Sequence, residues 1–262
     1  MSFKRFLVAT SAIALMLPFS AMAQSADPKA PVTHEEFSAM LKDALMKNPE
    51  MIVDAIKELQ QKQKAQTAKE VEKAIDKNHD ALFDASAPSI GDPKGDVTIV
   101  EFFDYHCGYC KHMLPVITQL NKDDSKVHII FREFPILSED SNTAAYAALA
   151  VNRLYPDKYF AFHTALMGTS SKFDDKSLSE IAKKLDLDWK KIKKEMDSPD
   201  IKAAIDKNRA MAEDIGIRGT PALIMGKQLM PGAVSYDDLK KMVANVRAGK
   251  PAMVDQDVGK PN

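Results

Sequence analysis

Two patterns of hydrophobic and polar positions follow one another along the chain. Between residues 33 and 84, apolar residues recur at helical spacing and no stretch has the pattern of a strand. Residues 60–70 are almost all Gln, Lys, Ala and Glu, which favours a helix without an apolar side to bury. We therefore expect 33–84 to form a helical stalk that buries its apolar stripe against copies of itself. The alternative is that these helices pack back on the main domain. The stripe consists of Phe37, Met40, Leu41, Ala44, Leu45, Ile52, Ala55, Ile56, Leu59, Val71, Ile75 and Leu82.

The second pattern begins after a loop rich in Pro, Gly and Asp at residues 85–96, which marks a domain boundary. Buried strands are predicted at 97–103 and 127–134, with a helix at 107–121 between them. The order of strand, helix, strand, helical insertion, two strands and helix is typical of an α/β fold with an inserted helical cap. The remaining predicted elements are helices at 139–154, 157–168, 175–185, 188–197 and 199–214, strands at 221–225 and 228–230, and a final helix at 236–247.

The first 23 residues are expected to be an export signal and not part of the fold. A basic pair, Lys4 and Arg5, precedes an apolar run at 6–19, and the small-residue pattern Ala-Met-Ala follows at 21–23. The run is shorter than the roughly 20 apolar residues that a membrane span needs. We therefore expect cleavage before Gln24 and an exported mature protein.

Composition and charge narrow the chemistry. A formal net charge of -1 over 262 residues gives no reason to expect a nucleic-acid partner, because such proteins carry a concentrated basic surface. The chain has two cysteines, Cys107 and Cys110, which leaves a zinc site two ligands short unless other side chains complete it. A disulfide across two intervening residues closes almost no loop and so stabilises little. In an exported protein this pair therefore indicates reactivity rather than a structural role.

The cysteine pair lies after a predicted strand and opens a predicted helix. Unpaired N–H groups and the macrodipole at a helix N-terminus favour a thiolate at Cys107. Cys110 lies one turn further along the same face, and we expect it to be more buried. This arrangement makes Cys107 the attacking thiol and Cys110 the thiol that resolves a mixed disulfide. The competing interpretations are half of a zinc site and a Cu(I) site, whereas a c-type haem would need histidine where Lys111 stands.

Residues 102–111, Phe-Phe-Asp-Tyr-His-Cys-Gly-Tyr-Cys-Lys, resemble the active-site segment of the thioredoxin superfamily. Within that superfamily they are similar to the periplasmic DsbA-like thiol–disulfide oxidoreductases. Pro115 in the middle of the active-site helix belongs to the same resemblance. So does Gly219-Thr220-Pro221, which looks like the loop that carries the family's cis-proline beside the disulfide.

The resemblance covers residues 90–250, and Asn48-Pro49-Glu50 in the stalk resembles the oligomerising arm of the ScsC (suppressor of copper sensitivity protein C) branch. It implies a periplasmic protein with a thioredoxin fold that has an inserted helical domain and is preceded by an N-terminal helical oligomerisation stalk. The expected domains are a signal peptide at 1–23, the stalk at 24–84, the first half of the thioredoxin fold with the active site at 85–138, the helical insertion at 139–214, the second half with the cis-proline loop at 215–248, and a flexible tail at 249–262.

The resemblance also implies roles for residues around the cysteine pair, and it implies neither a metal nor a cofactor. Glu101 occupies the position of the family's buried acid, where an apolar setting raises the pKa of the carboxyl and lets it accept the Cys110 proton through water. A cis Thr220-Pro221 bond would expose Thr220 backbone groups beside Cys107, where an extended substrate can pair as an added strand. The candidate substrate-binding residues are Thr220, Pro221, Gly108, Tyr109 and His106.

Other conspicuous residues are expected to be structural. Arg132 and Glu133 near Pro135 are interpreted as members of an ion pair rather than as catalytic groups. His112 is expected on an exposed helix face, and Trp189 is expected to anchor the core of the insertion.

We expect the protein to act on disulfides or thiols of exported proteins, and we favour the isomerase or reductase direction. Gly108-Tyr109 and a threonine before the cis-proline look like the DsbC isomerases, and an isomerase benefits from oligomerisation through 33–84. A membrane reductant resembling DsbD would then keep the cysteines reduced. The first alternative is a DsbA-like oxidase, which would depend on a DsbB-like quinone reductase. The alternative of another class is a copper-tolerance protein whose cysteine pair holds Cu(I), a soft ion suited to thiolates.

Overall fold

A computed structural model describes residues 32–170 and 172–253. The predicted signal peptide at 1–23 and residues 254–262 of the predicted tail lie outside the described residues. Within the described ranges, no helix is long and apolar enough to cross a membrane.

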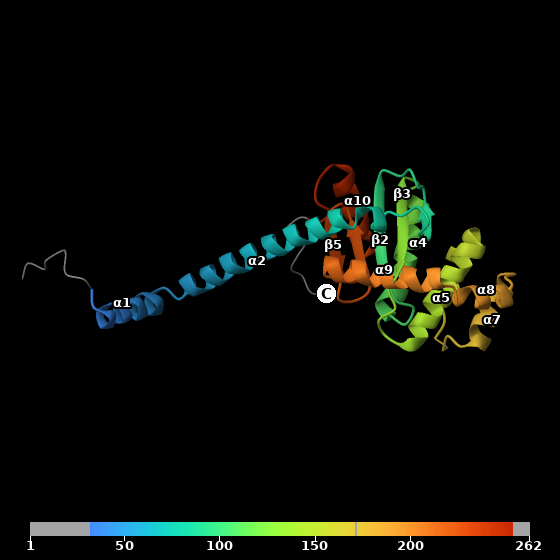
Figure 1. Cartoon of the computed structure of the whole chain (residues 1–262). Helices are drawn as coiled ribbons and strands as arrows, with labels where there is room; N and C mark the ends of the chain where they lie inside the picture. Colours follow the sequence, from blue (N-terminus) through green and yellow to red (C-terminus); the bar gives the residue numbers. More distant parts are fainter. Residues whose placement is uncertain (1–31, 171, 254–262) are drawn as a thin grey trace, which may run out of the picture. The chain divides into compact units, whose positions relative to one another are not determined.

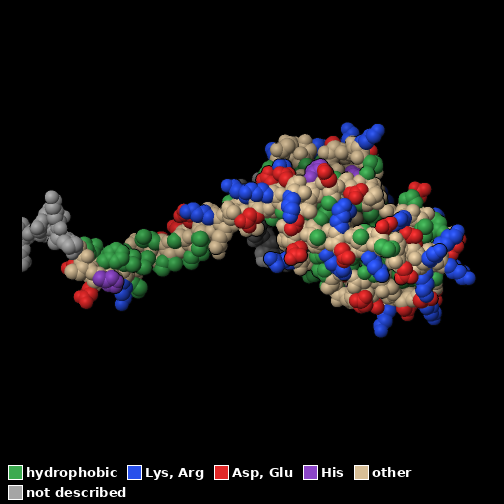
Figure 2. Space-filling model, in the orientation of Figure 1, with side chains coloured by type: hydrophobic (Ala, Val, Ile, Leu, Met, Phe, Trp, Pro, Cys, Tyr) green, Lys and Arg blue, Asp and Glu red, His purple; other side chains and the backbone are tan. Residues whose placement is uncertain are grey.

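The chain separates into two compact units, one that ends at Glu58 and one that begins at Leu59. The first unit holds α1 (His34–Lys47) and the beginning of α2 (Glu50–Lys77). A capping box starts α1, because the Thr33 side chain accepts from the N–H of Glu36 and the Glu36 carboxylate accepts from Thr33 N–H. Large apolar side chains on this unit are 47–75 % exposed, and they form the green surface over α1 and the start of α2 in Figure 2. They are Val32, Phe37, Met40, Leu41, Met46, Met51, Ile52, Val53 and Ile56.

The second unit is built on a five-stranded sheet with the order β1-β3-β2-β4-β5 (Figure 1). Its centre is the parallel pair β2 (Val97–Phe103) and β3 (Val127–Glu133), both at the predicted positions. Two antiparallel strands, β4 (Ala222–Met225) and β5 (Gln228–Pro231), follow on one side. Because β2 and β3 run parallel, their carboxyl ends lie at the same edge of the sheet, and the segments that follow them meet there.

The loop predicted at 85–96 contains a strand that its sequence does not reveal. This strand, β1 (Ser89–Gly91), pairs antiparallel with β3 and forms one edge of the sheet. Three residues are too few to show an alternating pattern, so only the backbone pairing defines the strand. Gly91 ends it with a φ of 85°, and an added Cβ would lie 2.1 Å from Val127 O. Glycine is therefore required where the chain leaves the sheet.

Helices cover both faces of the sheet, and those between β3 and β4 form the predicted insertion (Figure 1). The segment predicted as one helix at 157–168 is a 3-10 turn, η1 (Pro156–Lys158), followed by α6 (Tyr159–Met167). Trp189 is partly buried and packs against the core, as predicted. The other helices of the unit are α3 (His79–Leu82), α4 (Gly108–Asp123), α5 (Glu139–Leu154), α7 (Asp175–Lys184), α8 (Trp189–Met196), α9 (Pro199–Ile215) and α10 (Tyr236–Arg247).

The C-terminal end of the predicted stalk belongs to the second unit's core, so the predicted stalk boundary at residue 84 is too late. Ile75 and Leu82 are 2 % and 0 % exposed and pack in the cluster on the α9 side of the sheet. The guanidinium of Arg132 donates to the carbonyl oxygens of Ala81 and Leu82, the latter at 2.8 Å. A buried cation thus satisfies backbone groups at the end of α3. For the C-terminal end of α2 and for α3, the alternative prediction is therefore correct: these helices pack on the main domain.

The tail expected to be flexible from residue 249 is ordered as far as 253. Ala252 is 2 % exposed, and its carbonyl accepts from Asn245 Nδ2 at 3.1 Å. The N–H of Met253 donates to Gln228 Oε1 at 3.0 Å. Apolar residues just beyond α10 therefore extend the core next to β5. The tail as a whole is polar, so its composition did not predict this packing.

Candidate active site

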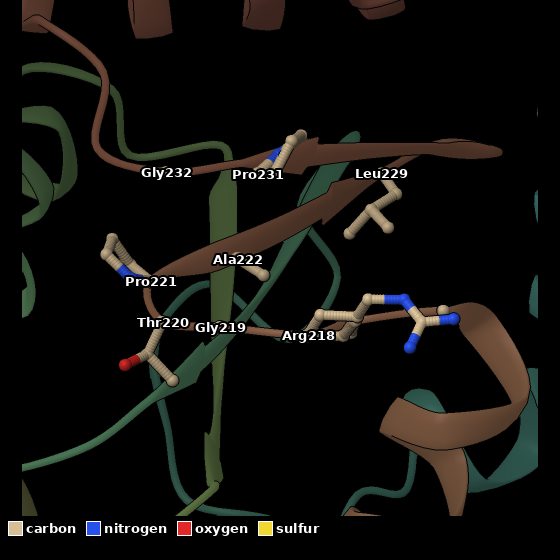
Figure 3. Close-up of a pocket in the computed structure, with 10 residues that line it drawn as sticks. Arg218, Gly219, Thr220, Pro221, Ala222, Leu229, Pro231 and Gly232 are labelled. Atoms are coloured by element: carbon tan, nitrogen blue, oxygen red, sulfur yellow. The ribbon is translucent and has the colours of Figure 1, made fainter. Parts of the chain in front are cut away.

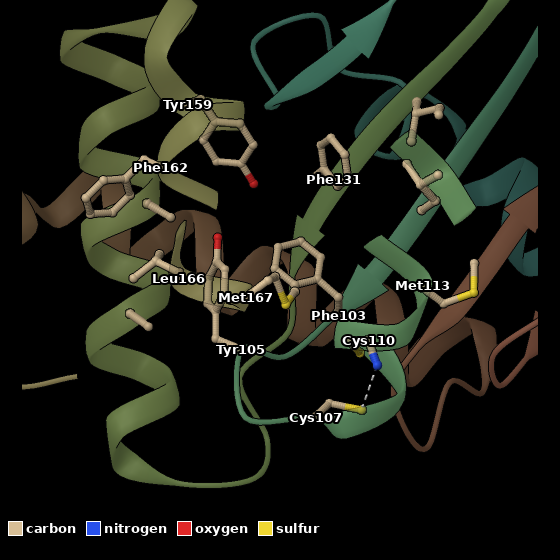
Figure 4. Packing of buried hydrophobic residues seen from close by; sticks show 14 of the residues in the cluster. Phe103, Tyr105, Cys107, Cys110, Met113, Phe131, Tyr159, Phe162, Leu166 and Met167 are labelled. Atoms are coloured by element: carbon tan, nitrogen blue, oxygen red, sulfur yellow. Dashed lines mark hydrogen bonds between the residues drawn. The ribbon is translucent and has the colours of Figure 1, made fainter. Parts of the chain in front are cut away.

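Cys107 lies at the N-cap of α4, four residues after the end of β2. Its sulfur accepts a hydrogen bond from the N–H of Cys110 at 3.4 Å, and its thiol donates to the carbonyl oxygen of Thr220 at 3.2 Å. Figure 4 shows Cys107 at the outer end of the pair and the dashed contact to Cys110. No disulfide bond joins the two cysteines in this structure, and their exposed fractions are 6 % for Cys107 and 1 % for Cys110.

The two thiols therefore have different environments. Burial raises the pKa of the Cys110 thiol well above its ordinary value, so this thiol keeps its proton until a base removes it. Cys107 is closer to solvent, and the N-terminus of α4 together with the Cys110 N–H favours negative charge on its sulfur. This difference suits Cys107 as the nucleophile and Cys110 as the resolving thiol.

Glu101 lies on β2 between Phe131 of β3 and Leu223 of β4, and it is 3 % exposed. Burial raises the pKa of the Glu101 carboxyl to about 8. Alternation along β2 places Glu101 on the same face as Phe103, which is the face that α4 covers. A carboxyl that titrates near neutral pH thus lies beneath the helix that carries both cysteines.

The Thr220–Pro221 peptide bond is cis, as the resemblance led us to expect. The loop that contains it connects α9 to β4, and the Pro221 carbonyl accepts from the N–H of Gly232 at 2.8 Å. The hydroxyl of Thr220 is buried and has no hydrogen-bond partner among the described residues. Thr220 and Pro221 line a shallow cavity, shown in Figure 3, that also borders Leu229. This loop and the cysteine pair, 113 positions apart in the chain, thus form one site.

The other candidate substrate-binding residues differ in their settings. Tyr109 is 69 % exposed, and an added Cβ on Gly108 would meet nothing within 4 Å. His106 turns towards the insertion, with its ring centroid 4.8 Å from that of Phe173 and its Nε2 atom 4.0 Å from Asp140 Oδ2. The start of α4 at Gly108 and Tyr109 is therefore accessible to a partner. His106 instead packs against residues of the insertion. His112 lies on the exposed face of α4, as predicted.

Asp104, which the sequence analysis did not single out, holds the turn before the nucleophile. It is 1 % exposed and accepts four hydrogen bonds at 2.7 to 3.0 Å. The donors are His106 N, Ser141 Oγ, Ile136 N and Leu137 N. One carboxylate thus joins the turn before Cys107 to the segment after β3. The sequence could have indicated this role, because Asp104 is an acidic residue directly after a buried strand.

A second buried polar cluster lies where the sheet meets the insertion, and Figure 4 shows two of its members, Tyr105 and Tyr159. The hydroxyls of Tyr105 and Tyr159 both donate to Glu133 Oε1, at 3.1 and 2.9 Å, and Tyr105 Oη lies 3.1 Å from His163 Nδ1. Burial raises the pKa of Glu133 well above its usual range and lowers that of His163 to about 3. Burial thus favours the uncharged form of both side chains.

The prediction that Arg132 and Glu133 are members of structural ion pairs is wrong for the described residues, because Arg132 donates to backbone carbonyls and Glu133 accepts from tyrosine hydroxyls. Neighbouring residues on a strand point to opposite faces of the sheet. Arg132 accordingly faces α3, and Glu133 faces the tyrosines of the other side.

Comparison with known proteins identifies the domain. Residues 98–244 match the family described as the DSBA-like thioredoxin domain. The chain belongs to this family. Residues 35–66 match a second family, described as the copper resistance protein ScsC N-terminal domain. The protein is thus a thiol–disulfide oxidoreductase of the DsbA and ScsC family, with Cys107 and Cys110 as its Cys-x-x-Cys pair.

Solved structures of the family extend over different parts of the chain. A thioredoxin-like oxidoreductase from Silicibacter pomeroyi is 41 % identical, with a TM-score of 0.62 and coverage of 65 % of this chain and 98 % of that one. ScsC of Proteus mirabilis in a transitional conformation is 31 % identical, with a TM-score of 0.62 and coverage of 82 % and 97 %. A periplasmic thioredoxin-like protein from Salmonella enterica serovar Typhimurium is 32 % identical, with a TM-score of 0.56 and coverage of 65 % and 95 %.

Among residues 32–170 and 172–253, no group of three or more His, Cys, Asp or Glu side chains could hold a metal ion. At the active site, the thiols of Cys107 and Cys110 are two side chains that could bind a soft metal ion such as Cu(I).

Proposed function

We propose that the protein exchanges thiols and disulfides with exported proteins in the periplasm, mainly as an isomerase or reductase. The observation that carries the proposal is the 3.2 Å contact between Cys107 Sγ and Thr220 O. A nucleophile is held there beside backbone groups of the cis-proline loop, where an extended client segment can pair. The periplasmic relative from Salmonella supports the compartment.

The exchange begins when the Cys107 thiolate attacks one sulfur of a client disulfide. The client's S–S bond breaks, a Cys107–client disulfide forms, and the other client sulfur leaves as a thiolate. In isomerisation, a different client thiolate attacks the mixed disulfide and releases Cys107, so no electrons are consumed. In reduction, the ionised form of Glu101 takes the Cys110 proton through water, and the Cys110 thiolate attacks Cys107 Sγ in the mixed disulfide. The client then leaves as a dithiol, and the Cys107–Cys110 disulfide must be reduced again by a membrane reductant resembling DsbD.

The isomerase direction is supported by the first unit and by the residue before the cis-proline. The exposed apolar side chains of α1 and early α2 suit a homo-oligomer, and the match to the ScsC N-terminal domain covers this segment. An oligomer can surround a misfolded client and keep the cysteines away from an oxidising partner. Thr220 and the Gly108-Tyr109 dipeptide favour the same direction through their likeness to the DsbC isomerases.

A secreted enzyme with scrambled disulfides tests the proposal. We expect mature protein in a thiol-based redox buffer to restore the enzyme's activity, and we expect Cys107→Ala to abolish the recovery. Cys110→Ser should accumulate a mixed disulfide with the client, because the resolving thiol is missing. No recovery, together with fast oxidation of the same enzyme in its reduced form, would instead establish a DsbA-like oxidase that depends on a DsbB-like partner.

Copper binding is a second candidate, and the description of the ScsC N-terminal family favours it. In the dithiol form, Cys107 and Cys110 could supply two thiolates to Cu(I). Cys110→Ser separates the two functions, since it spares mixed-disulfide formation but removes one thiolate. Tight Cu(I) binding by the wild type, with no client captured by Cys110→Ser, would favour the copper function over exchange.

A further inference from the structure

Arg218 lies two residues before Thr220, in the loop that carries the cis-proline. It lines the same cavity as Thr220 and Pro221, and Figure 3 shows its guanidinium directed away from Pro221 and below Leu229. The other residues lining this cavity are glycine, apolar or uncharged. Arg218 therefore supplies the charge of this surface.

The guanidinium of Arg218 is exposed and, among the described residues, takes part in no ion pair or side-chain hydrogen bond. A neighbouring arginine shows the contrast: Arg209 donates to Pro135 O at 3.2 Å and to Asn142 Oδ1 at 2.6 Å. These hydrogen bonds give Arg209 a structural role, whereas the guanidinium of Arg218 makes no comparable contact among the described residues.

A second cavity also borders Arg218 and is lined by Phe134, Ile136, Arg209, Glu213 and Ile217 among others. It contains two cations and one anion, so its charge is also positive overall. Arg218 is the charged residue that the two cavities share. A client segment that crosses the cis-proline loop would therefore meet this guanidinium in either cavity.

We propose that Arg218 selects clients that carry a carboxylate close to the cysteine under attack. The inference rests on the proposed exchange with exported proteins, because that exchange brings a client sulfur to Cys107. Thr220 O lies 3.2 Å from Cys107 Sγ, and two residues of chain span about 7 Å at most. An Asp or Glu about two residues from the client cysteine can therefore reach Arg218. The planar guanidinium pairs with a carboxylate through two parallel hydrogen bonds, which makes the contact selective.

The expected effect is moderate because the site is open to solvent. Ion pairs at exposed positions change an equilibrium by about two- to fivefold, and salt weakens them. The contact should therefore appear in kcat/KM for clients rather than in the chemistry of the cysteine pair.

Two disulfide-linked model peptides test the inference. They differ only in having Asp or Lys two residues from the cysteine, and the measured quantity is the second-order rate constant of their reduction by the full mature protein. We expect the wild type to reduce the Asp peptide about two- to fivefold faster at low salt. Arg218→Lys keeps the charge but not the paired hydrogen bonds and should weaken this preference, Arg218→Gln should remove it, and Arg218→Glu should reverse it. Lys202→Gln removes one positive charge from the exposed face of α9, outside both cavities, and should leave the preference unchanged.

The possible failures are distinguishable. Equal rates for the two peptides with the wild type, or a preference that survives in Arg218→Gln, would overturn the role of Arg218 and leave the exchange function intact. A wild type that reduces neither peptide would overturn the proposed function and, with it, the inference.

Discussion

The hydroxyl of Tyr159 donates a hydrogen bond to Glu133 Oε1 across 2.9 Å, and the hydroxyl of Tyr105 donates to the same oxygen across 3.1 Å. Tyr159 lies on α6 of the insertion, Glu133 ends β3, and Tyr105 lies two residues before Cys107. A single carboxyl oxygen thus joins the insertion, the sheet and the turn that leads to the nucleophile.

Substitutions at Glu133 should separate the contribution of its hydrogen bonds from that of packing. We expect Glu133→Gln to change the free energy of unfolding by less than about 1 kcal/mol, because an amide oxygen can still accept from both phenols. Glu133→Leu removes the oxygen that accepts from the buried Tyr105 and Tyr159 hydroxyls and should cost about 1–3 kcal/mol. Urea unfolding at pH 7 measures both. Equal losses in the two variants would show that packing, and not hydrogen bonding, matters at this position.

Glu101 should make the protein's stability depend on pH. Burial raises the pKa of its carboxyl from 4.5 to about 8, so the folded state holds a proton that the unfolded state releases. The stability contribution is fully present below pH 4.5 and is lost as the pH rises towards 8. Relative to Glu101→Gln, the wild type should lose up to about 1.4 kcal/mol per pH unit in this window. Unfolding curves of both proteins between pH 4 and 9 give the difference, and a constant difference would contradict the shift.

The same carboxyl should set the rate at which a mixed disulfide is resolved. Cys110 must lose its proton to attack, and burial raises the pKa of that thiol far above neutral. We expect Glu101→Gln to slow resolution by about tenfold or more at pH 8, while the formation of the mixed disulfide by Cys107 is unchanged. Rapid-quench kinetics across pH separates the two steps. A resolution rate with the wild-type pH profile in Glu101→Gln would exclude Glu101 as the base.

Two truncations should distinguish the parts of the predicted stalk. Deletion through Glu58 removes the exposed apolar side chains and should leave a folded monomer. Deletion through Asp84 also removes Ile75 and Leu82, whose burial contributes about 1.5–3 kcal/mol each, and should lower the melting temperature clearly. Light scattering and thermal unfolding measure the two effects. If the variant deleted through Glu58 has the same number of subunits as the mature protein, the first unit is not the oligomerisation element.

Features that depend on local sequence were predictable. The apolar runs of β2 and β3, the cysteine pair at the start of α4 and the Thr220-Pro221 motif all lie within short segments whose pattern carries the information. The helix start at Thr33 was also visible, because a capping box needs only four residues.

Features that depend on distant partners were not predictable. β1 exists through its pairing with β3, and Ile75 is buried because α9 lies near it, although its spacing alone suited a free stalk equally well. Glu133 looked like half of an ion pair, since nothing in its neighbourhood along the chain shows that two tyrosine hydroxyls point at it. Buried polar contacts between residues about 30 positions apart have no periodicity that a sequence pattern can reveal.

Both edges of the sheet are short: β1 has three residues and β5 has four, the last of which is Pro231. An unfolded polypeptide that extends the sheet at either edge therefore finds only a few backbone groups to pair with, and proline offers no N–H. Prolonged capture and co-aggregation through strand addition are thereby disfavoured. In the proposed exchange, the covalent bond to Cys107 would then be the main link to a client, and its cleavage would also release the client.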